Sequence, residues 1–230
     1  MADLRIGIVG IGNMGSAHFN YVNSGKIEGM TLSAVCDLRQ ERLDYCKENA
    51  PGVRCYTDWQ ELVKDPNIDA IIIAVPHPLH ADIAMAALTA GKHVLTEKPV
   101  DVRISKAQTL NECAAKSGKV FGIVFNQRTN PLYQKMRQII ADGGIGELQR
   151  VTWIITDWFR TQQYYDSGSW RATWSGEGGG VLINQCPHQI DLVQWVVGEL
   201  PVQVNSFCQY GKWHDIEVED EVTAYFRYKN

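Results

Sequence analysis

A glycine-rich turn near the start of the chain is the sequence feature that most constrains its fold. An alternating apolar run over Leu4–Val9 predicts a strand, and the residues from 16 to 22 continue a helical pattern. Between them lies the segment Gly-Ile-Gly-Asn-Met-Gly, residues 10–15. A turn of this kind, directly after a strand and directly before a helix, is typical of the βαβ units that bind dinucleotides.

Each glycine of this segment has a physical role in such a unit. Gly10 permits a tight turn, Gly12 lets the backbone approach a pyrophosphate, and Gly15 lets the helix pack closely on the strand. Asn13 and Met14 fall at the helix start, where backbone amides and the positive end of the helix face the phosphates. We therefore predict that these residues bind a dinucleotide cofactor, the alternative being a glycine turn without a ligand.

An acidic residue follows the turn at the spacing of a dinucleotide site. Asp37 ends a second apolar run, Thr31–Cys36, and its carboxylate is placed to accept hydrogen bonds from the adenine ribose hydroxyls, which favours NAD. Arg39 and Arg42 lie nearby and can accommodate a 2′-phosphate, so NADP remains an alternative cofactor. The competing interpretation of Asp37 is a helix N-cap.

Strand and helix patterns alternate through residues 1–125, which predicts a Rossmann domain with a doubly wound parallel sheet. The β-branched run in Asp69–Val75 is typical of a strand buried on both faces. The other predicted strands are Val53–Tyr56, His93–Thr96 and Val120–Phe125, and the predicted helices are Gln40–Asn49, a turn capped by Asp58 that reaches Lys64, Pro78–Ala90 and Ile104–Ser117.

Residues 126–230 follow a different pattern, which predicts an α+β domain with an open, mainly antiparallel sheet. The predicted elements are a helix over Pro131–Ala141, a long strand over Glu147–Arg160, a helix over Val181–Val197, and strands over Pro201–Tyr210 and Glu217–Tyr228. The last strand runs into the start of a hairpin turn without a partner strand, which leaves an exposed sheet edge. We therefore expect the chain to be a truncation or a part of a longer protein.

Composition excludes several classes of function. The chain is 45% hydrophobic and 21% charged, with a net charge of −4 and no Lys/Arg cluster, so we expect no nucleic-acid binding. No apolar run is long enough to span a bilayer, and no signal peptide precedes the first strand, so we expect no membrane association. The six cysteines show no Cys-x-x-Cys pairing, which indicates free thiols in a reducing, cytoplasmic compartment.

Two predicted strand ends carry residues suited to chemistry, because the carboxyl ends of parallel strands line the ligand crevice of an open α/β sheet. The buried strand runs into Pro76, His77 and His80, where we expect hydrogen bonds to the cofactor or a cap on the next helix. These two histidines lack a third ligand at short spacing, so we predict no metal site. The next strand runs into Glu97 and Lys98, which also point into the crevice and which we also expect to bind the cofactor.

Lys98 is a candidate acid–base residue. An ammonium group in a crevice is partly desolvated, which suits it to donate or accept a proton. The competing interpretation is a surface salt bridge with Glu97.

A second candidate cluster follows the three glycines at 178–180. If Val181–Val197 is one helix, Asn184 and His188 are four residues apart and share a face, and Pro187 kinks the helix beside His188. Histidine is the side chain best suited to take a proton near neutral pH, although a helical histidine can also be an ordinary satisfied polar residue.

These motifs resemble the Gfo/Idh/MocA oxidoreductases over the whole chain. The resemblance rests on the glycine turn, on Asp37, on the sequence Glu97-Lys98-Pro99, and on the glycine-rich loop before His188. It implies an NAD(P)-dependent dehydrogenase of sugars, cyclic polyols or related compounds. It also implies that Lys98 contacts both the nicotinamide ribose and the substrate hydroxyl, that the Lys98–Pro99 bond is cis, and that the family members are longer than this chain.

The resemblance assigns roles in the second half as well. Gln127 and Arg128 at the domain junction, together with Trp170 and Arg171, are expected to reach the nicotinamide half of the cofactor. The commonest family pattern has aspartate where this chain has Asn184. Asparagine cannot act as a carboxylate base, but its amide can orient a substrate hydroxyl.

Aromatic side chains are frequent between residues 158 and 174. They either form a wall on which a sugar stacks or pack the sheet and an oligomer contact. The residues are Trp158, Phe159, Tyr164, Tyr165 and Trp174.

Together these features predict an oxidoreductase that moves a hydride between a nicotinamide cofactor and a ring hydroxyl of a sugar, cyclitol or related polyol. His188 takes the hydroxyl proton, Lys98 polarises the same oxygen, and Asn184 orients the substrate. The alternatives are an NAD-dependent glycosidase that uses a transient oxidation and a non-catalytic dinucleotide-binding sensor. We expect a homo-dimer or homo-tetramer, because the uncovered face of an open sheet needs a partner.

Overall fold

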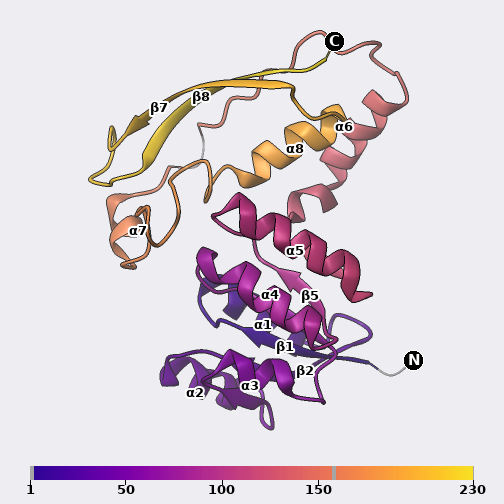
Figure 1. Cartoon of the computed structure of the whole chain (residues 1–230), viewed down its shortest axis with the longest axis vertical. Helices are drawn as coiled ribbons and strands as arrows, with labels where there is room; N and C mark the ends of the chain where they lie inside the picture. The colour runs from indigo at the N-terminus through magenta and orange to yellow at the C-terminus, as the bar shows by residue number, and fades with distance from the viewer. Residues whose placement is uncertain (1–2, 157–158, 230) are drawn as a thin grey trace. The chain divides into compact units, whose positions relative to one another are not determined.

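The computed structural model describes residues 3–156 and 159–229 and divides the chain into two compact units, Met1–Val124 and Phe125–Asn230 (Figure 1). The first unit is built on a sheet of six parallel strands in the order β3-β2-β1-β4-β5-β6. Its strands are β1 (Leu4–Val9), β2 (Met30–Cys36), β3 (Arg54–Tyr56), β4 (Ala70–Ile73), β5 (His93–Thr96) and β6 (Phe121–Ile123). The doubly wound parallel sheet predicted from the sequence is confirmed.

Helices connect these strands and cover both faces of the sheet. They are α1 (Asn13–Asn23), α2 (Gln40–Asn49), α3 (Trp59–Lys64), the short 3₁₀ helix η1 (His77–Leu79), α4 (His80–Thr89) and α5 (Ile104–Ser117). Asp58 caps α3 as predicted, because its carboxylate accepts a hydrogen bond from the amide of Gln60 at 2.8 Å. The helix expected over Pro78–Ala90 is divided into η1 and α4, since Pro78 lies in the 3₁₀ turn that comes first.

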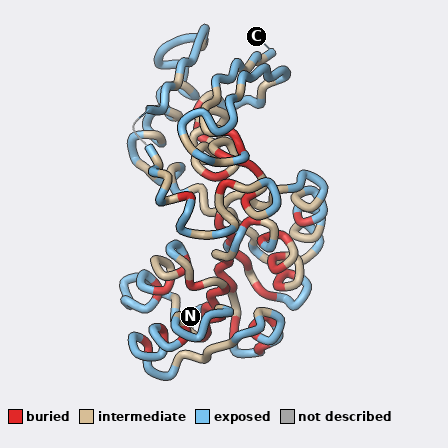
Figure 2. Tube along the Cα trace, turned by 90° about the vertical axis from the view of Figure 1, so that its left-hand side faces the viewer, coloured by how far each residue is buried: buried red, intermediate tan, exposed pale blue. Residues whose placement is uncertain are grey.

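The core of the first unit consists of two apolar clusters, one on each face of the sheet. Leu62, Ile83 and Leu110, from α3, α4 and α5, pack on one face. Phe19 and Leu43, from α1 and α2, pack on the other. Figure 2 shows these buried residues as a red band along the strands, with exposed residues on the outer helix surfaces. The burial of both faces explains why the strands are so rich in isoleucine and valine.

Strand register places the functional loops along one edge of this sheet. Val9 at the end of β1 pairs with Cys36 and with Ile73, and Ile73 in turn pairs with Thr96. The strand order reverses at β1, because β2 lies on one side of it and β4 on the other. The residues that leave the sheet beside this switch point are Gly10, Asp37, Ala74 and Glu97. Ligands bind at such switch points in open α/β sheets.

The second unit is α+β, with a hairpin of two antiparallel strands. Its elements are η2 (Asn126–Thr129), α6 (Pro131–Ala141), α7 (Gln162–Asp166), α8 (Pro187–Val197), β7 (Gln203–Tyr210) and β8 (Glu219–Arg227). A small core forms where Tyr165, Ala172 and Val218 meet. The hairpin is mostly exposed, as its pale colour in Figure 2 shows.

The long strand predicted over Glu147–Arg160 is wrong. The described residues 147–156 and 159–160 form no strand, and Ile154 is 77% exposed. A strand needs a neighbour for its backbone hydrogen bonds, and within the described residues the sheet of this unit contains only β7 and β8. Apolar alternation alone could not reveal that this partner is missing. Trp158 lies outside the described residues.

The helix predicted over Val181–Val197 begins six residues later than expected. Gly178 and Gly179 have φ of 84° and 153°, which are not helical angles, and the amide of Val181 bonds to the carbonyl of Glu219 on β8 at 2.9 Å. The backbone is thus held against the hairpin, and α8 starts at Pro187, a residue suited to the first helical position. The predicted kink at Pro187 is therefore wrong, and Asn184 and His188 are not on one helix.

Candidate active site

The glycine turn has the geometry that a phosphate-binding loop requires. Gly10 has φ of +90°, and a Cβ there would lie 2.5 Å from the carbonyl oxygen of Ala74. A Cβ at Gly15 would lie 1.7 Å from the carbonyl oxygen of Gly10, so α1 packs directly on the turn. A Cβ at Gly12 would meet nothing within 4 Å. The backbone at Gly12 therefore borders open space at the amino end of α1, where an anion is favoured.

Asp37 joins this turn to the start of α2. Its Oδ2 accepts a hydrogen bond from the amide of Ile11 at 2.7 Å, and its Oδ1 accepts one from the amide of Arg39 at 2.9 Å. The N-cap residue of α2 is Arg39, so the alternative of Asp37 as the N-cap is wrong. The Nε of Arg39 lies 3.6 Å from Oδ1 and places a positive charge beside the carboxylate.

His80 supports the loop after β4. The ring is buried, with Nδ1 2.6 Å from the carbonyl oxygen of Pro99 and Nε2 2.7 Å from that of Val75. Both ring nitrogens thus face backbone carbonyls, so the ring ties Val75 to Pro99, and the cofactor contact expected of this residue stays a prediction. Burial lowers the pKa of His80, although the two carbonyls favour the charged ring. His77 is also buried, and its ring centre lies 5.9 Å from that of His80. Pro76 precedes η1 as its N-cap residue.

The Glu97-Lys98-Pro99 segment is held from both sides by histidines. The carboxylate of Glu97 is buried and lies 2.8 Å from Nε2 of His18 in α1. On the other side, Pro99 is held by His80. Lys98 between them is partly buried, and its bond to Pro99 is cis, as the family resemblance implied. His18 is not among the residues predicted from the sequence, and its position three residues after Gly15 is the signal that points to it.

In the second unit, His188 lies in the first turn of α8. Its ring packs edge-on against Phe125, with 6.1 Å between ring centres. Arg128 of η2 binds Asp191 of the same helix through two hydrogen bonds, one of which joins Nε to Oδ2 at 2.7 Å, and this pairing raises the pKa of Arg128. Gln127 is half-buried in η2. The Arg128–Asp191 pair therefore anchors η2 to the helix that carries His188.

Asn184 lies in the turn before α8 and belongs to a polar network. Its Nδ2 donates to Oε1 of Glu177 and, at 3.4 Å, to the hydroxyl oxygen of Tyr164. The same hydroxyl oxygen accepts a hydrogen bond from Nη1 of Arg171 at 2.6 Å. The Arg171 guanidinium also lies over the rings of Tyr164 and Trp170, at 4.3 Å and 4.7 Å from their centres. The structure thus joins Trp170, Arg171 and Asn184, which the sequence singled out separately.

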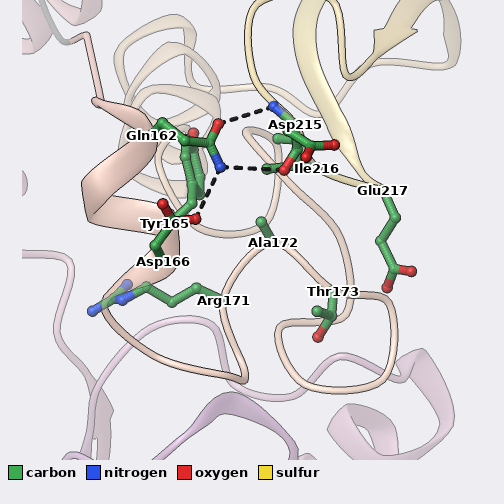
Figure 3. Close-up of a pocket in the computed structure, with 9 residues that line it drawn as sticks. All are labelled: Gln162, Tyr165, Asp166, Arg171, Ala172, Thr173, Asp215, Ile216 and Glu217. Atoms are coloured by element: carbon green, nitrogen blue, oxygen red, sulfur yellow. Dashed lines mark hydrogen bonds between the residues drawn. The ribbon is translucent and has the colours of Figure 1, made fainter.

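A pocket of about 410 Å³ opens beside this network (Figure 3). Gln162 lines this pocket; its amide nitrogen donates to Oδ1 of Asp166 and to the backbone oxygen of Asp215, and its amide oxygen accepts from the Asp215 amide. Its lining residues are Gln162, Tyr165, Asp166, Arg171, Ala172, Thr173, Asp215, Ile216 and Glu217. Three carboxylates, one guanidinium and an amide suit a neutral ligand that carries several hydroxyl groups better than a strongly anionic one.

Within the described residues, no group of three or more His, Cys, Asp or Glu side chains is arranged to hold a metal ion. No helix in the same part of the chain combines the length and apolarity needed to cross a membrane.

Each of the two units matches a known protein family. Residues 4–125 match the family profile described as "Oxidoreductase family, NAD-binding Rossmann fold", and residues 133–230 match the "GFO/IDH/MocA C-terminal domain". The myo-inositol 2-dehydrogenase of Thermotoga maritima is 27% identical over 198 residues, which are 85% of this chain and 55% of that protein. The chain thus spans about half the length of the curated relatives it matches.

Solved structures resemble the chain as well. The WlbA dehydrogenase of Bordetella pertussis, in complex with NADH and UDP-GlcNAcA, has a TM-score of 0.87 at 28% identity over 99% of this chain and 68% of that one. The scyllo-inositol dehydrogenase of Lactobacillus casei, with bound NAD(H) and scyllo-inositol, has a TM-score of 0.76 at 26% identity over 90% of this chain and 60% of that one.

Proposed function

Since the chain belongs to the Gfo/Idh/MocA family of oxidoreductases, we propose that it is an NAD(P)-dependent dehydrogenase. The reaction is hydride transfer between the nicotinamide and a ring hydroxyl of a sugar, cyclitol or related polyol. The observation that carries this proposal is the gathering of the glycine turn, Asp37 and the Lys98 segment along one sheet edge at the switch point.

The first unit fits the cofactor. The open space beside Gly12, at the amino end of α1, suits a pyrophosphate, and no acidic side chain stands in the first turn of that helix to repel it. A carboxylate has about four lone-pair sites, so Asp37 can still accept hydrogen bonds from ribose hydroxyls beside the two it receives from backbone amides. We assign NAD as the cofactor, with NADP as the alternative because Arg39 offsets the charge of Asp37.

Catalytic roles follow from side-chain chemistry. When bound, the nicotinamide supplies the carbon that accepts or gives the hydride. Lys98 donates a hydrogen bond to the substrate oxygen and stabilises its developing charge. His188 takes the proton of the hydroxyl group, and Asn184 orients the substrate through its amide. Gln127, Trp170 and Arg171 are proposed to contact the nicotinamide half of the cofactor.

Replacement of Lys98 tests the assignment. Lys98→Ala and Lys98→Met should lower kcat roughly 100-fold to 1,000-fold, which is the range for loss of one donor that stabilises developing charge. NADH affinity, measured by fluorescence titration, should change little because the glycine turn is intact. Lys106→Ala is the matched control, since this lysine pairs with Asp82 on the outer helices. A Lys98→Ala variant with unchanged turnover would contradict the proposal.

A substrate panel separates the reaction from its alternatives. Sugars and inositols are incubated with NAD or NADP, and reduced nicotinamide is followed by absorbance. Net NADH formation supports the dehydrogenase, whereas sugar release without net NADH indicates a glycosidase with a transient oxidation. Cofactor binding without either product indicates a sensor.

We further propose a homo-dimer or homo-tetramer in a reducing, cytoplasmic compartment. The β7–β8 hairpin exposes large apolar side chains, among them Phe207 at 82% and Tyr225 at 62%, and such a surface is typical of an interface. All six cysteines are free thiols, and burial raises the pKa of Cys36 and of Cys46 to about 12, which makes both poor nucleophiles.

A further inference from the structure

Glu177 is a fully buried carboxylate that the proposed reaction does not use. It lies in the glycine-rich loop of the second unit with 0% of its surface exposed. Its Oε2 accepts a hydrogen bond from the amide of Ala172 at 2.6 Å, and its Oε1 accepts one from Nδ2 of Asn184. Ala172 has φ of 53°, the only described residue other than glycine with a positive φ. One carboxylate therefore holds both the turn after Arg171 and the side chain of Asn184.

The chemistry of the two side chains determines which of them donates and which accepts in the contact between Glu177 and Asn184. Both oxygens of Glu177 accept hydrogen bonds, Oε2 from the Ala172 amide and Oε1 from position 184, so the side chain at position 184 must offer an N–H group. Tyr164 reinforces this orientation, because its hydroxyl oxygen also lies on the Nδ2 side of the amide. The amide oxygen Oδ1 is then turned to the opposite side, where it is an acceptor.

The same contact accounts for the identity of residue 184. An aspartate there would place a second carboxylate against Glu177 in a buried site, and two adjacent carboxylates cannot both ionise without a large cost. With Glu177 present, asparagine keeps the shape of the side chain and an acceptor oxygen while removing the repulsion.

We propose that Glu177 is a positioning residue that orients Asn184, so that Oδ1 of Asn184 accepts a hydrogen bond from a substrate hydroxyl. The inference rests on the proposed function of the site. In the commonest family pattern an aspartate at position 184 carries the negative charge. Here the charge belongs to Glu177, which contacts the substrate only through Asn184.

An exchange of the two functional groups tests the pair. Three variants are compared with the wild type: Asn184→Asp, Glu177→Gln and the double variant that carries both. Asn184→Asp should lower Tm by several degrees near pH 8, and acidification should reduce this loss, because uptake of one proton relieves the repulsion. The double variant restores an amide–carboxylate pair and should recover most of the wild-type Tm.

Kinetics provide the second readout. Glu177→Gln frees the Asn184 amide to turn its nitrogen toward the substrate, so kcat/KM for the substrate should fall roughly 10-fold to 100-fold. The affinity for NADH should stay within about 2-fold of the wild type, because the variant leaves the first unit unchanged. In the double variant kcat/KM should rise above that of either single variant.

Glu219→Gln is the matched control. Glu219 is a buried carboxylate of the same unit that accepts hydrogen bonds from the amides of Gly180 and Leu182. Its effects should be additive with those of Asn184→Asp, whereas those of Glu177→Gln should not. Additive losses for the Glu177–Asn184 pair would overturn the proposal. The coupling between the two substitutions is measured as changes in Tm without substrate, so it tests the Glu177–Asn184 pair independently of the proposed function. The substrate panel tests the dehydrogenase assignment itself.

Discussion

At the scale of single residues, His80 shows how burial and hydrogen bonding oppose each other. Two carbonyl oxygens, 2.6 Å and 2.7 Å away, favour a doubly protonated ring, whereas removal from water favours the neutral one. Burial is the larger effect, so the pKa of His80 lies below its ordinary value of 6.5. Glu97, Asp101 and the neighbouring His77 are the other titratable groups around it. The ring ties the loop after β4 to the segment that carries Lys98.

This lowered pKa predicts a pH dependence of stability. The unfolded chain takes up a proton on His80 as the pH falls through 6.5, whereas the folded ring resists it until a lower pH. The contribution of His80 is therefore fully present above pH 6.5 and is lost progressively below it. His80→Gln should flatten the fall in Tm between about pH 7.5 and pH 5.5.

His93→Gln is the control for that measurement. It removes a histidine of the same sheet that is only partly buried and accepts a hydrogen bond from the amide of Val120. If His80→Gln leaves the slope of Tm against pH as steep as in the wild type, protonation of the buried His80 ring is not the cause of the loss of stability at low pH.

At the scale of elements, the unit β1–turn–α1 separates the folding role of a glycine from its ligand role. Gly15 is required for packing, because a Cβ would overlap the carbonyl of Gly10. Gly12 has an extended backbone, with φ of −77° and ψ of −158°, that any residue adopts, and its Cβ would enter open space. Only a ligand would make Gly12 necessary.

Alanine substitution at the two positions should therefore have opposite signatures. Gly15→Ala should lower Tm by several degrees, since a backbone overlap must be relieved by movement of α1. Gly12→Ala should leave Tm within about 2 °C of the wild type but weaken NADH binding at least about 10-fold, because the added methyl blocks the approach of the pyrophosphate. Thermal unfolding and fluorescence titration measure the two effects. Equal NADH affinity in Gly12→Ala and the wild type would argue against a pyrophosphate at this turn.

At the scale of the whole molecule, the two units differ in how they bury apolar surface. The first unit covers both faces of its sheet with helices, whereas the β7–β8 hairpin of the second leaves many of its side chains exposed. The buried carboxylate of Glu219 compensates in part, because it binds the glycine-rich loop to β8, while Glu177 holds the turn within that loop.

The exposed hairpin predicts self-association. Phe207→Glu places a charge at an 82% exposed position of β7 and should shift the protein from oligomer to monomer in light scattering after gel filtration. Ile104→Glu is the matched control, since Ile104 is 79% exposed at the start of α5 in the first unit. A monomeric wild type, or an oligomer that both variants leave intact, would show that the hairpin is not the interface.

The sequence by itself determined the first unit and its ligand edge. Local geometry requires glycine at positions 10 and 15. The period of the apolar pattern identifies the β-branched strands and the strand end that carries Asp37. Parallel register then brings the strand ends together. Tertiary structure alone decided the second unit: whether residues 147–160 find a partner strand, and where the helix that carries His188 begins. Tertiary structure alone also decided the contact of Glu177 with Asn184. The position of a buried carboxylate depends on a loop that is folded by its contacts with β8, and no periodicity in the chain records such a contact.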